Sequence, residues 1–166
     1  MSSLTILGID PGIKNTGYGV LNVTDNNQPQ LFTYGYIHTS SKNSLAERLY
    51  QIYSGLEKII NKVNPDIIVV ENIFYSENVK TAIIMGHARG AILTAAMNSG
   101  CEIAEYSPRE VKQSVVGNGG AAKEQVHYMV KRLLNTKEDI QPDDASDALA
   151  VALCHWHKLK YNRLVE

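Results

Sequence analysis

The sequence predicts an α/β fold in which a five-stranded mixed sheet is covered by helices on both faces. Three features indicate this fold: short apolar runs typical of strands, longer segments with helical periodicity between the later runs, and one unbroken β-branched run at 67–70. With 166 residues, of which 44% are apolar and 20% charged, the chain has the size and composition of one ordinary soluble domain.

Three strands are expected first, in antiparallel succession. Residues 4–10 form a short apolar run that ends in a carboxylate, Asp10, directly before a Pro-Gly turn. Residues 17–23 and 30–38 are rich in Tyr, Val, Thr and Phe, and the Asp-Asn-Asn cluster at 25–27 supplies turn residues between them. Asp10 is therefore expected at the end of the first strand.

A helix and a fourth strand follow. Apolar residues recur at three- and four-residue steps over 45–60, and Ser44 and Glu47 form the pattern of a capping box at the start of this segment. After a Pro-Asp break, the run Ile-Ile-Val-Val at 67–70 predicts a strand covered on both faces, and this strand ends at Glu71.

The remaining elements are four helices and a fifth strand. Residues 78–98 predict a helix whose small residues suit close helix packing, and residues 101–105 predict the strand. Further helices are expected at 108–116, at 121–134 after a Gly-Asn-Gly-Gly loop, and from about Pro142 to Trp156.

The organisation is expected to be one domain over residues 1–158 and a short basic tail over 159–166. Two cysteines are too few for a disulfide framework and lack the paired spacing of a thiolate metal site. Neither a basic leader nor a bilayer-length apolar run is found. These features predict a cytoplasmic protein without a membrane partner. The net charge of −1 does not by itself indicate a polyanionic partner.

Four carboxylates are the candidate catalytic residues. Asp10 and Glu71 end two apolar strands, where a carboxylate is costly unless a cation or another partner lies nearby. Asp144 and Asp147 are three residues apart and share one helix face. If that face docks beside the strand ends, the oxygens suit Mg²⁺ or Mn²⁺, and two such ions support phosphodiester hydrolysis. Taken singly, each carboxylate also fits a plainer role in a turn or a helix cap.

Basic residues gather between positions 106 and 134. The cations there are Arg109, Lys112, Lys123, Lys131 and Arg132, against the acidic Glu110 and Glu124. Phosphate contacts are a natural use for such an excess, and Lys123 also opens a helix after a glycine-rich loop, where free amides attract anions. Solvated helix faces are the plainer interpretation. The loop lacks the Gly-Lys-Ser/Thr ending of a Walker motif, which excludes that kind of nucleotide site.

Several segments, in order through nearly the whole chain, also match a known family. They are Gly-Ile-Asp-Pro-Gly at 8–12, Thr-Gly-Tyr-Gly-Val at 16–20, Glu-Asn-Ile-Phe at 71–74, Gly-His-Ala-Arg-Gly at 86–90, Val-Lys-Gln at 111–113 and Asp-Ala-Ser-Asp-Ala-Leu-Ala at 144–150. On these segments the chain resembles the RuvC family of bacterial crossover (Holliday) junction endodeoxyribonucleases.

The resemblance implies a ribonuclease H-like fold and a structure-selective endonuclease of recombination and repair. Such an enzyme resolves a four-way junction by paired symmetric nicks in strands of like polarity. The resemblance further implies a homodimer, two Mg²⁺ ions per active site with Mn²⁺ as a substitute, and the RuvA and RuvB branch-migration proteins as partners. It makes Asp10 the carboxylate that bridges two metals, with Glu71 on one side and Asp144 and Asp147 on the other.

The DNA-binding residues are expected to be Phe74, Arg109, Lys112 and Lys123. Phe74 falls where the family places an aromatic residue that stacks on a base near the opened junction centre, although a phenylalanine is more commonly a packing residue. Lys112 and Lys123 match basic residues that the family places near the scissile phosphate. The small-residue helix over 78–98 is the expected dimer contact.

Three other interpretations compete with this one. Actin-like kinases and ATPases also open with a strand that ends in aspartate before a glycine-containing turn, but their two lobes need a much longer chain. A non-catalytic module of the same fold would bind branched DNA without cutting it, and the four intact carboxylates argue against that. A related ribonuclease H-like nuclease would act on RNA hybrids or another branched substrate, since a fold does not fix a substrate.

Overall fold

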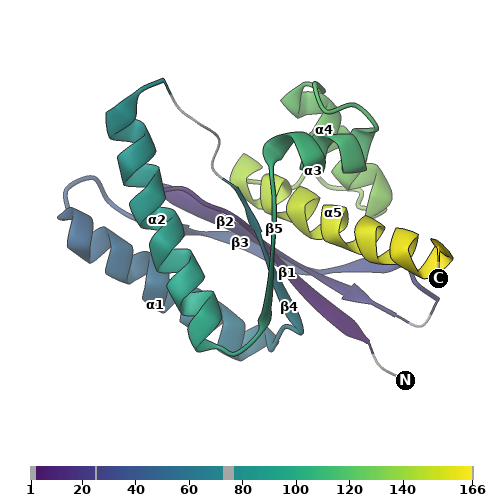
Figure 1. Ribbon diagram of the computed structural model, residues 1–166, viewed down its shortest axis with the longest axis horizontal. Helices are drawn as coiled ribbons and strands as arrows, with labels where there is room; N and C mark the ends of the chain where they lie inside the picture. The colour runs from purple at the N-terminus through teal and green to yellow at the C-terminus, as the bar shows by residue number, and fades with distance from the viewer. Residues whose placement is uncertain (1–2, 25, 73–76, 166) are drawn as a thin grey trace.

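A mixed sheet forms the centre of the molecule (Figure 1), as seen in a computed structural model that describes residues 3–24, 26–72 and 77–165. Its strands are β1 (Leu4–Asp10), β2 (Asn15–Val23), β3 (Pro29–His38), β4 (Ile67–Glu71) and β5 (Glu102–Tyr106). They lie in the order β3-β2-β1-β4-β5, with antiparallel pairing from β3 to β1 and parallel pairing from β1 to β5. The predicted five-stranded mixed sheet is confirmed over the described residues.

Helices cover both faces of this sheet (Figure 1). The first pair, α1 (Leu45–Val63) and α2 (Val79–Asn98), packs on one face. The other face carries α5 (Asp143–Val165), with α3 (Pro108–Val116) and α4 (Lys123–Leu133) packed against it. None of the helices in the described ranges combines the length and apolar character needed to cross a bilayer.

Strand alternation divides the core into two hydrophobic clusters. In β4, Ile68 and Val70 join the cluster under α1 and α2, whereas Ile67 and Val69 join the one under α5. Because both faces are buried, this strand consists of consecutive β-branched residues, as the sequence predicted.

The ends of two helices test the local predictions. The capping box of α1 is present: Glu47 N donates to Ser44 Oγ at 3.2 Å, and Ser44 N donates to the Glu47 carboxylate at 2.7 Å. The prediction that the last helix ends near Trp156 is wrong, because α5 continues to Val165. The ammonium groups of Lys158 and Lys160 lie 4.9 and 5.3 Å from the ring centres of Tyr106 and Trp156, so charged side chains pack along the helix after its apolar periodicity ends.

Glycines in β1 and β2 allow α5 to approach the sheet closely. A Cβ atom on Gly17 would lie 2.0 Å from the carbonyl oxygen of Asp144, and one on Gly8 would lie 2.1 Å from that of Ala148. Any larger residue would push the helix away. Gly17 is also the pairing partner of Asp10, so this contact places the first turn of α5 beside the end of β1.

Candidate active site

Two strand ends and the start of one helix bring the four predicted carboxylates to the same edge of the sheet. Asp10 ends β1 and Glu71 ends β4, and these strands are parallel neighbours. The preceding residues, Ile9 and Val70, point into the cluster under α1 and α2, so Asp10 and Glu71 point to the opposite face, where α5 lies. Asp144 and Asp147 come from the first two turns of α5, next to Gly17.

The four carboxylates interact electrostatically. Burial raises the pKa of Asp10 well above its usual value, and the negative charges of Glu71, Asp147 and Asp144 raise it further. Burial, together with the charge of Asp147, raises the pKa of Glu71 to about 7. Lys123 opposes both shifts. The site therefore carries an excess of negative charge that a bound cation would relieve.

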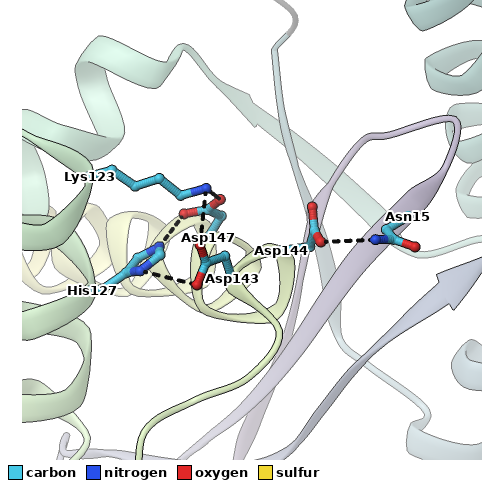
Figure 2. Close-up of polar contacts among 6 residues, drawn as sticks. All are labelled: Asn15, Lys123, His127, Asp143, Asp144 and Asp147. Atoms are coloured by element: carbon cyan, nitrogen blue, oxygen red, sulfur yellow. Dashed lines mark hydrogen bonds and ion pairs between the residues drawn. The ribbon is translucent and has the colours of Figure 1, made fainter.

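Helix α4 supplies the partners of Asp147. Figure 2 shows the Asp147 carboxylate directed at α4, where Oδ1 lies 2.8 Å from His127 Nε2 and Oδ2 lies 3.3 Å from Lys123 Nζ. The neighbouring Asp143 lies 3.7 Å from the same lysine and 3.8 Å from His127 Nδ1. A lysine and a histidine from one helix thus hold the outer side of the acidic site.

The sheet supplies the partner of Asp144. Asn15 Nδ2, at the start of β2, donates to Asp144 Oδ2 at 3.4 Å, and Asn15 Oδ1 lies 2.8 Å from His38 Nδ1 on β3. Asp144 and Asp147 therefore turn to different partners (Figure 2). Over the described residues, no three Asp, Glu, His or Cys side chains are gathered closely enough to form a metal-binding group.

The chemistry of these donors nevertheless fits a divalent cation. All four candidate ligands are carboxylates, and hard oxygen ligands are those that Mg²⁺ and Mn²⁺ prefer. Asp10 lies between the end of β4 and the first turn of α5, and the negative charges of Glu71, Asp147 and Asp144 add to burial in raising its pKa. The four carboxylates therefore offer oxygen ligands of the kind that a divalent cation needs.

A small cleft joins the acidic site to two of the predicted DNA-binding lysines. It has a volume of about 190 Å³ and is lined by Glu71, Pro108, Val111, Lys112, Lys123, Val126, Asp147 and Ala150. Arg109 lies elsewhere, in a groove between α3 and α5 that Lys158 and Tyr161 also line. Phe74 is outside the described residues. The structure thus brings Lys112 and Lys123 to the carboxylates and does not bring Arg109 there.

Sequence reasoning missed three polar residues near the carboxylates. One is His127, which a spacing could have revealed, because it follows Lys123 by four positions and so shares its helix face. Arg89 stood in a segment that matches the family but was given no role, and Asn15 gave no signal. Arg89, on α2, donates to the side chain of Asn72 at 2.5 Å and pairs with Glu105, so it fixes the residue that follows Glu71.

Comparison with known proteins places the chain in a family. The profile of the family Crossover junction endodeoxyribonuclease RuvC matches residues 6–155. Proteins named crossover junction endodeoxyribonuclease RuvC from Alkaliphilus oremlandii and Caldanaerobacter subterraneus are 49% and 50% identical to this chain over 154 residues, or 93% of each chain. The chain belongs to the RuvC family.

Comparison with solved structures agrees with this assignment. The structure of Thermus thermophilus RuvC in complex with a Holliday junction substrate has a TM-score of 0.89 and 34% identity, and the match covers 96% of both chains. The yeast mitochondrial Holliday junction resolvase Ydc2 has a TM-score of 0.67 at 17% identity, which shows a common fold alone. The predicted family and its ribonuclease H-like resolvase fold are confirmed.

Proposed function

We propose that this chain is a Holliday junction resolvase, an endonuclease that cuts a four-way DNA junction by paired symmetric nicks in two strands of like polarity. One observation carries the proposal: Asp10, Glu71, Asp144 and Asp147 lie at the same edge of the sheet, in a chain that matches a junction-bound RuvC over 96% of its length. Its roles would be homologous recombination and DNA repair, in the cytoplasm, with the RuvA and RuvB branch-migration proteins as partners.

Divalent metal ions are the cofactor that the carboxylates would hold. Mg²⁺ is proposed, two ions per site, with Mn²⁺ as a substitute. When bound, the ions supply activation of the attacking water and stabilisation of the leaving oxygen. Asp10 lies between Glu71 on the neighbouring strand and the aspartates of α5, which supports a bridging role for it. Burial and the neighbouring carboxylates raise the pKa of Asp10, so protons compete with the cation for this ligand.

The lysines of the cleft would orient the scissile phosphate. Lys112 and Lys123 line the same cleft as Glu71 and Asp147, so a phosphate beside the carboxylates would lie within reach of both ammonium groups. Arg109, exposed on α3 and away from the acidic edge, would contact the DNA backbone at a distance from the cut. Phe74 would stack on a base near the junction centre.

Helix α2 is the proposed dimer contact. It exposes the large apolar side chains of Val79, Ile83 and Met97, and nothing lies within 4 Å of a Cβ atom built on Gly86 or Gly90. An exposed apolar helix with small residues suits close packing against a second copy. A charge introduced by Ile83→Glu should therefore reduce the solution mass to that of a monomer and abolish paired cutting. A monomeric parent protein that still makes paired cuts would refute the dimer.

The resolvase proposal is tested with an end-labelled synthetic four-way junction in the presence of Mg²⁺. The parent protein should make paired symmetric nicks, and Asp10→Asn should bind the junction without cutting it. A linear duplex and an RNA–DNA hybrid serve as control substrates. Junction binding without cutting by the parent protein, in Mg²⁺ and in Mn²⁺ and over several junction sequences, would instead indicate a non-catalytic module, and preferential cutting of the hybrid would indicate another nuclease activity.

A further inference from the structure

Helix α4 places a histidine against one of the proposed metal ligands. His127 Nε2 lies 2.8 Å from Asp147 Oδ1. An ionised carboxylate only accepts hydrogen bonds, so Nε2 carries the hydrogen and donates it. Each of the two side chains is 23% exposed, so water competes little for the contact.

We propose that His127 is a positioning residue for Asp147, an inference that rests on the proposed metal site. An aspartate near the start of a helix can adopt several rotamers, and a hydrogen bond to one carboxylate oxygen selects among them. Because Oδ1 is engaged by His127, Oδ2 is the oxygen left for a divalent cation. Such a bond to the outer oxygen of a ligand fixes its orientation, and losing it typically weakens metal binding about 10- to 100-fold.

The surroundings of His127 favour positioning over simple packing. Val126 and Val130 are 5% and 0% exposed, so apolar residues already attach α4 to the core without help from the histidine. The second ring nitrogen, Nδ1, lies 3.8 Å from Asp143 Oδ1, so both edges of the ring face carboxylates of α5 (Figure 2). A histidine that served only to fill space would not need a carboxylate at each nitrogen.

Lys123 does not duplicate this role. Its ammonium lies 3.3 Å from Asp147 Oδ2, and it also lines the cleft with Lys112. The lysine therefore faces the oxygen that a cation would take, and its charge competes with that cation. His127 holds the other oxygen without occupying the cation's place. His127 and Lys123 thus contact different oxygens of the Asp147 carboxylate and have different effects on it.

The test is a calorimetric titration of the metal-free, full-length protein with Mn²⁺. His127→Ala should raise the dissociation constant about tenfold or more. His127→Gln, whose side-chain amide can still donate to Asp147, should stay within a few-fold of the parent. The matched control is Tyr128→Ala, the adjacent residue on α4, which is 60% exposed and should leave the affinity unchanged. Junction binding in a metal chelator should be the same for all four proteins.

Several results would overturn the inference. If His127→Ala is folded, as judged by its thermal transition, and binds Mn²⁺ like the parent, His127 does not position Asp147. Equal losses in His127→Ala and Tyr128→Ala would mean that α4 is merely destabilised, which also refutes the role. If the parent protein itself shows no Mn²⁺ binding that Asp10→Asn removes, the proposed metal site and this inference fail together.

Discussion

The two faces of the sheet are both buried, but they are built differently. Under α1 and α2 the core includes large side chains of both helices, such as Ile52, Leu56 and Ile92, which are fully buried. Under α5, by contrast, glycines in β1 and β2 bring the helix backbone into contact with the strands. Both faces supply buried apolar area, but only the α5 face also fixes where Asp144 and Asp147 lie. Placement of the site therefore depends on one face, whereas stability depends on both.

The largest effect is expected from Gly17→Ala on the α5 face. The new Cβ atom would lie 2.0 Å from the carbonyl oxygen of Asp144, so the first turn of α5 must move. A displacement of about 1 Å at an active site typically costs about 100-fold in rate. Junction cleavage under single-turnover conditions should fall by about that factor, while the unfolding free energy falls by about 1–3 kcal/mol.

Its matched control is Ile92→Ala on the other face. Removing this fully buried side chain should lower the unfolding free energy by about 2–5 kcal/mol, as much as or more than Gly17→Ala does. Cleavage at a temperature where both variants are folded should nevertheless stay near the parent rate. Equal activity of the two variants would break the proposed division between the faces.

Arg89→Met tests the contacts by which the Arg89 side chain links α2 to the end of β4, beside the acidic site. Arg89 pairs with Glu105 and donates to Asn72, next to Glu71. Loss of these charge-assisted bonds should lower stability by about 1–3 kcal/mol. Because the end of β4 loosens, cleavage should also fall, by about tenfold, a smaller factor than for Gly17→Ala. Arg89→Lys keeps the charge but not the fork geometry, so it should recover only part of the rate.

Glu71 should contribute to the pH dependence of stability in the metal-free protein, together with Asp10, whose pKa burial also raises. The pKa of Glu71 in the folded protein is raised to about 7 by burial, from 4.5, so the folded state binds the proton more tightly than the unfolded state does. The stability that the bound proton contributes is present below pH 4.5 and is lost as the pH rises through about 7. Urea denaturation in a chelator should show a loss of roughly 1–3 kcal/mol over this range. In Glu71→Gln the part of the stability loss that Glu71 causes should vanish. If the variant and the parent protein lose stability equally over this pH range, Glu71 is not the group responsible.

The smallest effect is expected at the start of α1. Ser44→Ala removes the acceptor of the Glu47 backbone N–H and should cost about 1 kcal/mol in urea denaturation. Cleavage should be unaffected, since α1 packs on the face that holds none of the four carboxylates. A reduced cleavage rate with an unchanged fraction of folded protein would show that a change on the α1 face affects the active site on the other face.

The sequence predicted the strands and two of the carboxylates because those signals are local. An apolar run that stops at Asp10 or Glu71 places a charge at a strand end without further information. The partners of the aspartates were not predictable in this way. Asn15 contacts Asp144 across 129 positions of the chain, and His127 contacts Asp147 across 20, so both contacts depend on how helices dock. Periodicity also failed at the end of α5, where the ammonium groups of Lys158 and Lys160 lie near the rings of Tyr106 and Trp156.

The order of the elements along the chain affects synthesis of the protein. The ribosome makes Asp10 and Glu71 early, whereas Asp144 and Asp147 belong to α5, the last helix of the described chain. Until α5 emerges, the glycines of β1 and β2 are uncovered and half of the carboxylates are missing. A product that ends before α5 would lack two of the four proposed metal ligands, and we expect it not to cut DNA. The proposed metal site is therefore incomplete until α5 has been made and has packed against the sheet.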